Sequence, residues 1–205
     1  MDETRYVVIE DHALTRLGIQ ELLRGTPGFA CTGSAATKRE ALDLLKAAAD
    51  SGTLPDLIIL DLFLGAESGM DIVRMAGAQW PGAAVVIYSM YSNPGIVSLA
   101  LECGAKAFVA KDGPTLELLR AVTEVRRGNS YIPQKLIAPL CTYRNVLDSL
   151  TRQEQSILKE IIQRRPEHQI AAGLNITYRS FKKYLSRIYD KTGCTSHEDL
   201  IARFG

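Results

Sequence analysis

Polar side chains that could bind a cation and a phosphoryl group stand directly after four short apolar runs. The runs cover residues 6–9, 57–60, 83–88 and 105–110, and the polar side chains are those of Glu10, Asp11, Asp61, Ser89 and Lys111. Three carboxylates repel one another unless a cation lies among them, and an oxygen-only ligand set suits Mg²⁺. A nearby ammonium and hydroxyl would bind phosphoryl oxygens. These residue types therefore indicate Mg²⁺-assisted phosphoryl transfer.

Each residue has a distinct role in that chemistry. Asp61 is the expected nucleophile, whose carboxylate would form an acyl phosphate. Lys111 would bind one phosphoryl oxygen, and Ser89 would donate a hydrogen bond to another. Such transfer depends mainly on positioning and on electrostatic stabilisation. A single Asp at a strand end is commonly a helix cap or turn residue, but suitable residues at successive strand ends argue for a site.

These side chains meet only if the apolar runs are parallel strands of one sheet. The first 128 residues alternate strand and helix patterns five times. The predicted strands are 6–9, 29–34, 57–60, 83–88 and 105–110, and the predicted helices are 14–24, 41–48, 68–78, 96–102 and 115–127. This alternation predicts an α/β fold with a five-stranded parallel sheet that is covered by helices on both faces. Ligands of such sheets bind at the carboxyl ends of the strands.

The last quarter of the chain has a purely helical pattern. Thr151 and Glu154 form a capping box, in which a hydroxyl and a carboxylate each satisfy a backbone amide. Residues 150–205 contain four short helical segments, which predicts an all-α helix-turn-helix domain. Residues 129–149 have weak periodicity and contain two prolines, so we expect a linker that is helical in part.

Composition and cysteine spacing limit the class of protein. The 205 residues are 46% hydrophobic and 23% charged, which is typical of a soluble globular chain. Apolar runs stay below the roughly 18 residues of a membrane span, and the N-terminus does not resemble a secretory signal. We therefore expect a cytoplasmic protein that does not bind membranes. Reduced, incidental thiols are expected for the four widely spaced cysteines: Cys31, Cys103, Cys141 and Cys194.

Charge is unevenly divided along the chain. Residues 1–128 have a net charge of −4 and residues 150–205 a net charge of +4. An acidic half that handles cations and a basic half that faces a polyanion would explain this division. The helix predicted from Tyr178 to Lys191 presents an outward polar face that suits the major groove of DNA and its flanking phosphates. That face carries Arg179, Lys182, Lys183 and Ser186.

Several of these motifs resemble those of a known family. Glu10-Asp11-His12, Asp61-Leu62-Phe63-Leu64, Ser89 and Lys111-Asp112-Gly113 resemble the receiver of a two-component response regulator. Residues 151–193 resemble the helix-turn-helix of the LuxR/NarL/FixJ class. The resemblance implies a receiver domain (1–128) with an α/β doubly wound, flavodoxin-like five-stranded parallel sheet, a linker (129–149) and a LuxR-type DNA-binding domain (150–205). It also implies phosphorylation of Asp61 by a sensor histidine kinase, transcriptional regulation through DNA, and a homodimer.

The resemblance also assigns roles within the two sites. Mg²⁺ would be held by the carboxylates of Glu10, Asp11 and Asp61 and by the backbone carbonyl of Phe63. Ser89 and Phe108 would be switch residues, with the Phe108 ring following Ser89 after phosphorylation. The positions that read bases match Lys182, Lys183 and Ser186. One departure is Leu64-Gly65, which replaces the usual Met-Pro after the phosphoacceptor and affects the expected lifetime of the phosphoryl group.

Two alternative hypotheses make different predictions for these residues. A phosphohydrolase with an aspartyl-phosphate intermediate typically has a general-acid Asp two residues after the nucleophile. Here that residue is Phe63, which cannot transfer a proton, so we do not expect an enzyme. An atypical regulator that binds DNA or a partner protein without phosphorylation stays open, because of the altered loop at Leu64-Gly65.

Overall fold

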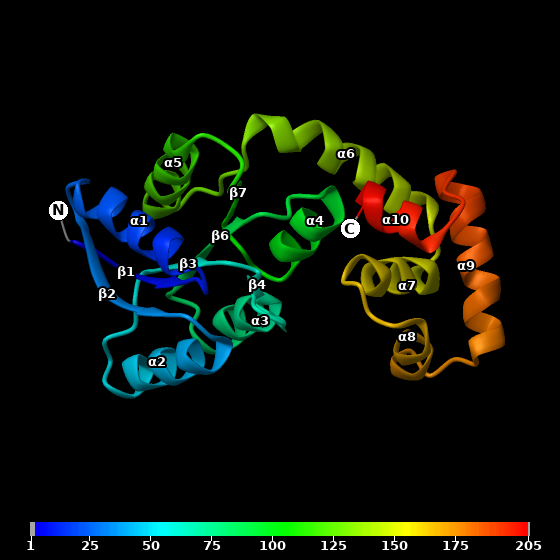
Figure 1. Ribbon diagram of the computed structural model, residues 1–205, viewed down its shortest axis with the longest axis horizontal. Helices are drawn as coiled ribbons and strands as arrows, with labels where there is room; N and C mark the ends of the chain where they lie inside the picture. Colours follow the sequence, from blue (N-terminus) through cyan, green and yellow to red (C-terminus); the bar gives the residue numbers. More distant parts are fainter. Residues whose placement is uncertain (1–2, 205) are drawn as a thin grey trace. The chain divides into compact units, whose positions relative to one another are not determined.

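The computed structural model describes residues 3–204, and they form two compact units (Figure 1). One unit extends to Tyr91 and continues with Ala100–Pro133. The other combines Ser92–Leu99 with the residues from Gln134 onward. Among the described residues, no helix combines the length and the apolar character needed to cross a bilayer.

The first unit is built on a five-stranded parallel sheet in the order β2-β1-β3-β6-β7. Its strands are β1 (Thr4–Ile9), β2 (Phe29–Ala35), β3 (Leu57–Leu60), β6 (Ala84–Ser89) and β7 (Ala107–Ala110). In the pairing register, Ile9 lies opposite Leu60, and Leu60 lies opposite Ile87. The residues that follow β1 and β3 therefore emerge side by side at one edge of the sheet. This sheet confirms the predicted doubly wound α/β fold.

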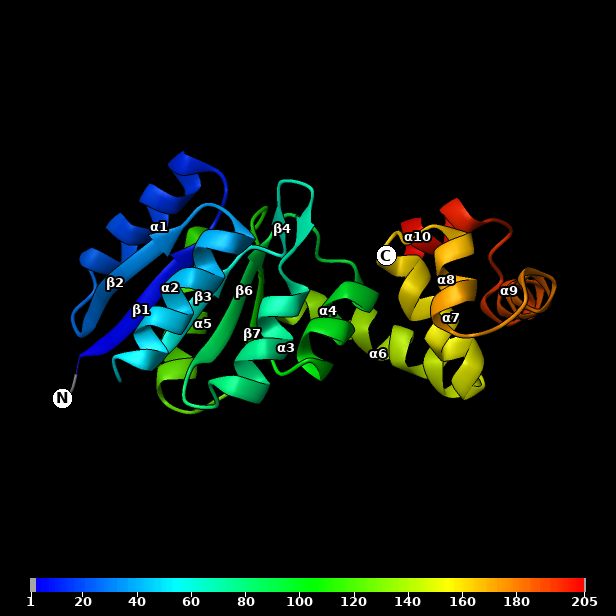
Figure 2. The same ribbon diagram turned by 90° about the horizontal axis from the view of Figure 1, so that it is seen from below.

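Helices cover both faces of this sheet, as the apolar strands require. Helices α1 (Ala13–Arg24) and α5 (Thr115–Arg126) lie on one face, and α2 (Lys38–Asp50) and α3 (Met70–Gln79) lie on the other (Figures 1 and 2). Helix α4 (Pro94–Glu102) follows β6 in the chain. The core under α1 and α5 joins buried side chains of these helices to those of the central strands, including Leu23, Leu118, Val8, Ile59 and Val86.

A short antiparallel ribbon follows β3, in the loop where the sequence departs from the family pattern. It consists of β4 (Phe63–Leu64) and β5 (Glu67–Ser68). Gly65 opens its turn with φ of +63°, a left-handed conformation that costs little only for glycine. A proline, whose φ is fixed near −65°, cannot adopt this conformation. The Leu64-Gly65 sequence therefore gives this loop its own shape.

The second unit is helical. It contains α6 (Gln134–Ser149), α7 (Arg152–Ile162), α8 (Glu167–Gly173), α9 (Tyr178–Thr192) and α10 (His197–Phe204). The predicted capping box is present at the start of α7, where the Thr151 hydroxyl and the Glu154 carboxylate each accept a hydrogen bond from the other residue's backbone N–H. The four helices after Leu150 confirm the predicted helical domain.

Within the predicted linker, which we expect to be helical in part, residues 134–149 form a continuous 16-residue helix. Pro139 lies inside α6, and an internal proline removes a backbone donor, so it argues against a helix at the level of sequence. Tyr143 and Leu147 are nevertheless buried in the core of the second unit. This packing outweighs the unfavourable local signal. The positions of the domain boundaries themselves stay a prediction.

Candidate functional site

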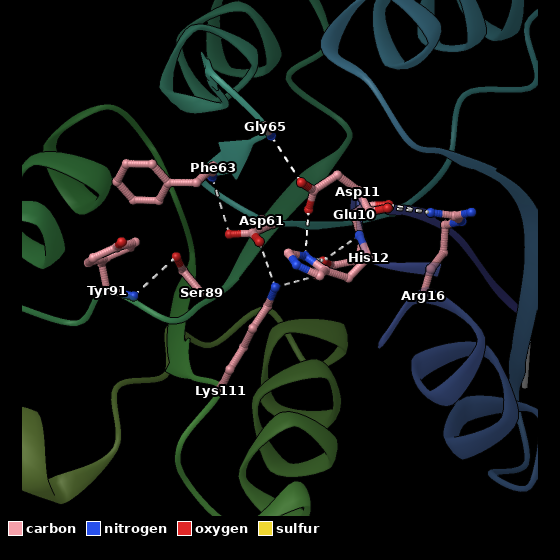
Figure 3. Close-up of polar contacts among 10 residues, drawn as sticks. All are labelled: Glu10, Asp11, His12, Arg16, Asp61, Phe63, Gly65, Ser89, Tyr91 and Lys111. Atoms are coloured by element: carbon pink, nitrogen blue, oxygen red, sulfur yellow. Dashed lines mark hydrogen bonds and ion pairs between the residues drawn. The ribbon is translucent and has the colours of Figure 1, made fainter. Parts of the chain in front are cut away.

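The carboxyl edge of the sheet brings together two buried carboxylates and one ammonium (Figure 3). Glu10 and Asp61 are only 1% and 5% exposed. The Nζ atom of Lys111 lies 2.6 Å from Glu10 Oε2 and 2.5 Å from Asp61 Oδ2. Buried charges need such partners. Lys111 thus compensates both carboxylates, and the three residues meet as the sequence predicts.

Lys111 is held in its charged form. Burial alone would lower the pKa of its ammonium, but the hydrogen bond to Asp61 and the ion pair with Glu10 outweigh burial and raise the pKa above 10.5. The group is therefore a permanent cation at neutral pH. A fixed positive charge beside Asp61 is what an incoming phosphoryl group would require.

Asp11 completes the acidic group and is more exposed than Glu10 and Asp61. Its Oδ2 accepts a hydrogen bond of 3.0 Å from the backbone N–H of Gly65, and its Oδ1 lies 2.8 Å from His12 Nδ1. Burial would raise the pKa of Asp11, but the Gly65 N–H and His12 outweigh it, and the pKa lies below its usual value. Asp11 is therefore anionic at neutral pH.

The ligand atoms of these residues are close enough to share one cation. Single atoms of Glu10, Asp11, His12 and Asp61 all lie within 4.8 Å of one another. Three of the four residues offer carboxylate oxygens, the ligand type that Mg²⁺ prefers. The donor set therefore fits the predicted Mg²⁺.

A cavity of about 420 Å³ adjoins the phosphoacceptor candidate, and it has room for a phosphoryl group. Its lining residues are Asp11, His12, Asp61, Phe63, Gly65, Ser89, Met90 and Tyr91. One oxygen of Asp61, Oδ1, accepts a hydrogen bond of 3.2 Å from the Phe63 N–H. Ser89 is fully buried at the end of β6. The structure therefore places Ser89 and Asp61 around one cavity.

Phe108 lies in the core. It is fully buried on β7, opposite Ile87 of β6. Its neighbours Ala107 and Val109 belong to the core under α1 and α5, so the alternation of side chains points Phe108 to the opposite face of the sheet. Its role as a switch stays a prediction.

Helix α9 has the two faces that the sequence predicts. The Thr177 hydroxyl caps the helix by accepting a hydrogen bond from the Ser180 N–H. The inner face of α9 is buried and carries Phe181, Leu185 and Ile188. The helix α8 and the turn that precedes α9 give the expected helix-turn-helix order. All four predicted DNA-binding residues are exposed: Arg179, Lys182, Lys183 and Ser186.

Three contacts of these sites were not foreseen. They are the Gly65 N–H on Asp11, the guanidinium of Arg16, which donates to the Glu10 carbonyl at 2.5 Å, and Glu167, whose carboxylate binds Lys182. Two of these contacts involve a backbone group, and the residue type does not show where a backbone N–H or C=O points. The third contact joins residues on different helices, so it could be predicted only from the packing of α8 against α9.

Family models match both units of the chain. The response regulator receiver domain matches residues 6–123, and the luxR family of bacterial regulatory proteins matches residues 148–204. The chain is a response regulator of the LuxR/NarL class. The curated relatives of this chain include regulators of this class, such as a DNA-binding transcriptional activator and a nitrate/nitrite response regulator.

Relatives resemble this response regulator over most of its length. The transcriptional regulatory protein YhcZ of Bacillus subtilis is 30% identical, over 91% of this chain and 88% of its own. The transcriptional activator DevR/DosR of Mycobacterium tuberculosis is 28% identical, over 91% and 87%. One similar solved structure is that of RcsB from Salmonella enterica serovar Typhimurium, bound to promoter rprA in the presence of a phosphomimetic. Its TM-score is 0.73 at 17% sequence identity, and the match covers 99% of this chain and 98% of the RcsB chain. At that identity the likeness shows the shared fold.

Proposed function

We propose that this response regulator accepts a phosphoryl group on Asp61 from a histidine kinase and thereby controls its own binding to DNA. The observation that supports this most is the group of buried carboxylates compensated by Lys111 beside a cavity. In the reaction, a carboxylate oxygen of Asp61 attacks the phosphorus of a phosphohistidine. The phosphorus–nitrogen bond breaks, the imidazole nitrogen leaves with its electron pair, and an acyl phosphate forms.

The residues around Asp61 would divide the remaining work. Lys111 already lies 2.5 Å from Asp61 Oδ2, so it would follow the new phosphoryl group with little movement. Ser89, buried in the same cavity, would donate its hydroxyl to another phosphoryl oxygen. Phe108 would then rearrange in the core, as the resemblance implies.

Glu10, Asp11 and Asp61, with the backbone carbonyl of Phe63, would hold Mg²⁺. When bound, the ion would neutralise negative charge on the phosphoryl oxygens and the carboxylates. His12 also lies within this group. The hydrogen bond from Gly65 and the contact with His12 keep Asp11 anionic, which is the form in which a carboxylate binds a metal ion.

The second unit would bind DNA through α9. The exposed basic side chains of α9 suit the major groove of DNA and the flanking phosphates. The second unit as a whole is also basic. A monomer of this size contacts one half-site, so we propose that phosphorylation favours a homodimer that binds two half-sites about one helical turn apart, or a multiple of it.

Phosphotransfer from acetyl phosphate tests this function. The full chain is incubated with acetyl phosphate and MgCl₂, and the phosphoryl adduct is measured by intact mass. We expect incorporation in wild type and in the control Asp43→Asn, an exposed carboxylate on α2, and none in Asp61→Asn or with a chelator present. Equal labelling of Asp61→Asn would overturn the site. DNA binding without any labelling of wild type would favour a regulator that acts without phosphorylation.

A further inference from the structure

Lys182, one of the basic residues on the exposed face of α9, is already occupied within its own unit. Its Nζ atom lies 2.9 Å from Oε1 and 2.8 Å from Oε2 of Glu167, the first residue of α8. It also lies over the ring of Tyr178, 5.4 Å from the ring centroid. The hydroxyl of Tyr178 donates to the same carboxylate at 2.6 Å. Glu167 therefore binds two groups of α9 at once.

The carboxylate of Glu167 is anionic and set in a partly buried place. Burial would raise its pKa, but the hydrogen bonds from Lys182 and Tyr178 outweigh burial, and the pKa lies below its usual value. The Nδ1 atom of His197, at the start of α10, lies 3.8 Å from Oε1. Groups from α9 and α10 thus surround this one carboxylate.

The other cations of the same face are in a different situation. Arg179 and Lys183 are exposed, and within residues 3–204 neither forms an ion pair. Both are therefore available to a polyanion at once. Lys182 is already paired, so a DNA phosphate competes with the Glu167 carboxylate for its ammonium.

We propose that Glu167 sets the DNA affinity of this regulator by competing with DNA phosphates for Lys182. On DNA of arbitrary sequence Lys182 stays on Glu167 and adds no phosphate contact. The inference rests on the proposed DNA binding by α9. Glu167 is a positioning residue in this role, since it acts through Lys182.

The salt dependence of binding distinguishes this role from a structural one. Each phosphate contact made by a lysine contributes about 0.9 to the slope of log affinity against log salt concentration. The substitution Glu167→Gln keeps the size of the side chain and removes its charge. It should release Lys182 to a phosphate, steepen the slope by about one, and raise affinity about two- to fivefold, since exposed ion pairs are weak.

The probe is a mixed-sequence 24-base-pair duplex, titrated with the full chain at several salt concentrations. The matched control is Glu160→Gln, which removes one negative charge from α7 where Glu160 pairs with Arg165. We expect the control to keep the wild-type slope. The double variant Lys182→Ala with Glu167→Gln should have the same slope as Lys182→Ala alone, because without Lys182 the loss of the Glu167 charge releases no phosphate contact.

Each contrary result has a distinct meaning. A wild-type slope in a folded Glu167→Gln variant overturns the proposal, as does an equal gain in Glu160→Gln or a gain that persists without Lys182. If wild type shows no salt-dependent binding to any duplex, the proposed DNA-binding function fails instead. Melting temperatures of all variants show whether each one is folded.

Discussion

The rings of Phe63 and Tyr91 lie with their centroids 4.5 Å apart and their planes tilted by 55°, at the cavity that contains Asp61. Phe63 begins the β4–β5 ribbon, and Tyr91 follows β6. Two loops from different strands therefore share one aromatic contact beside the proposed phosphoacceptor. We expect these rings to limit the access of water to a phosphoryl group on Asp61.

Removing either ring should shorten the life of the acyl phosphate. In Phe63→Ala or Tyr91→Ala, water gains access to the phosphoryl group, so we expect hydrolysis about threefold faster or more. Phe63→Tyr and Tyr91→Phe keep the rings and serve as controls. The measurement is the decay of the phosphoryl adduct after acetyl phosphate is removed. Equal half-lives in all four variants would show that the ring pair does not protect the site.

Loss of Lys111 should destabilise the first unit. In Lys111→Ala, Glu10 and Asp61 stay buried without a compensating cation, which costs about 3 kcal/mol of unfolding free energy. Added Mg²⁺ should restore part of this loss, because the ion binds the same carboxylates. The free energy is measured by urea unfolding with and without MgCl₂. Lys106→Ala, an exposed lysine, is the control, and a similar loss in this variant would contradict the explanation.

Acid should destabilise the second unit through Glu154. This carboxylate is 1% exposed and lies 2.7 Å from Lys191 Nζ. Burial would raise the pKa of Glu154, but Lys191 and the Thr151 amide outweigh it and lower the pKa below 4.5. A depressed pKa contributes stability that is complete above 4.5 and is lost as pH falls through the folded value.

Unfolding of wild type and Glu154→Gln at a series of pH values checks this expectation. The variant should lose about 1–3 kcal/mol near neutral pH, because the capping box and the ion pair are weakened, and its stability should fall less steeply in acid. Asp190→Asn, an exposed carboxylate on α9, should behave like wild type. Parallel pH curves for wild type and Glu154→Gln would show that this carboxylate is not the group responsible.

Lys183 and Arg179 should affect DNA binding in different ways. Lys183 lies near the start of α9, where we propose that side chains reach base edges, so Lys183→Ala should cost about 1–3 kcal/mol and relax preference at one base. Arg179→Ala should weaken binding on all sequences and reduce the salt slope by about one. Wild-type protein is first used to select an operator from random duplexes. The affinity of each variant for this operator and for a scrambled duplex then separates the two effects. Unchanged specificity in Lys183→Ala would exclude a base contact by this residue.

Much of the fold follows from local patterns. Repeated alternation of apolar strands with amphipathic helices predicts the parallel sheet, and the order of polar residues at strand ends predicts that Asp61 and Lys111 meet. Helix α6 was only partly predicted, because Pro139 weakens the local signal while Tyr143 and Leu147 are buried by distant residues. Sequence patterns predict helices and strands well where the intrinsic preference of the residues agrees with tertiary packing.

The residue types at the strand ends and on the outer face of α9 can be identified from the amino-acid sequence. The partners of these residues depend on the tertiary structure. Gly65 donates to Asp11 across 54 positions, and Lys182 binds Glu167 across 15. Such contacts depend on the path of a loop and on the packing of α8 against α9. Hydrogen bonds and ion pairs act over a few ångströms, so they form only after the fold has brought distant segments together.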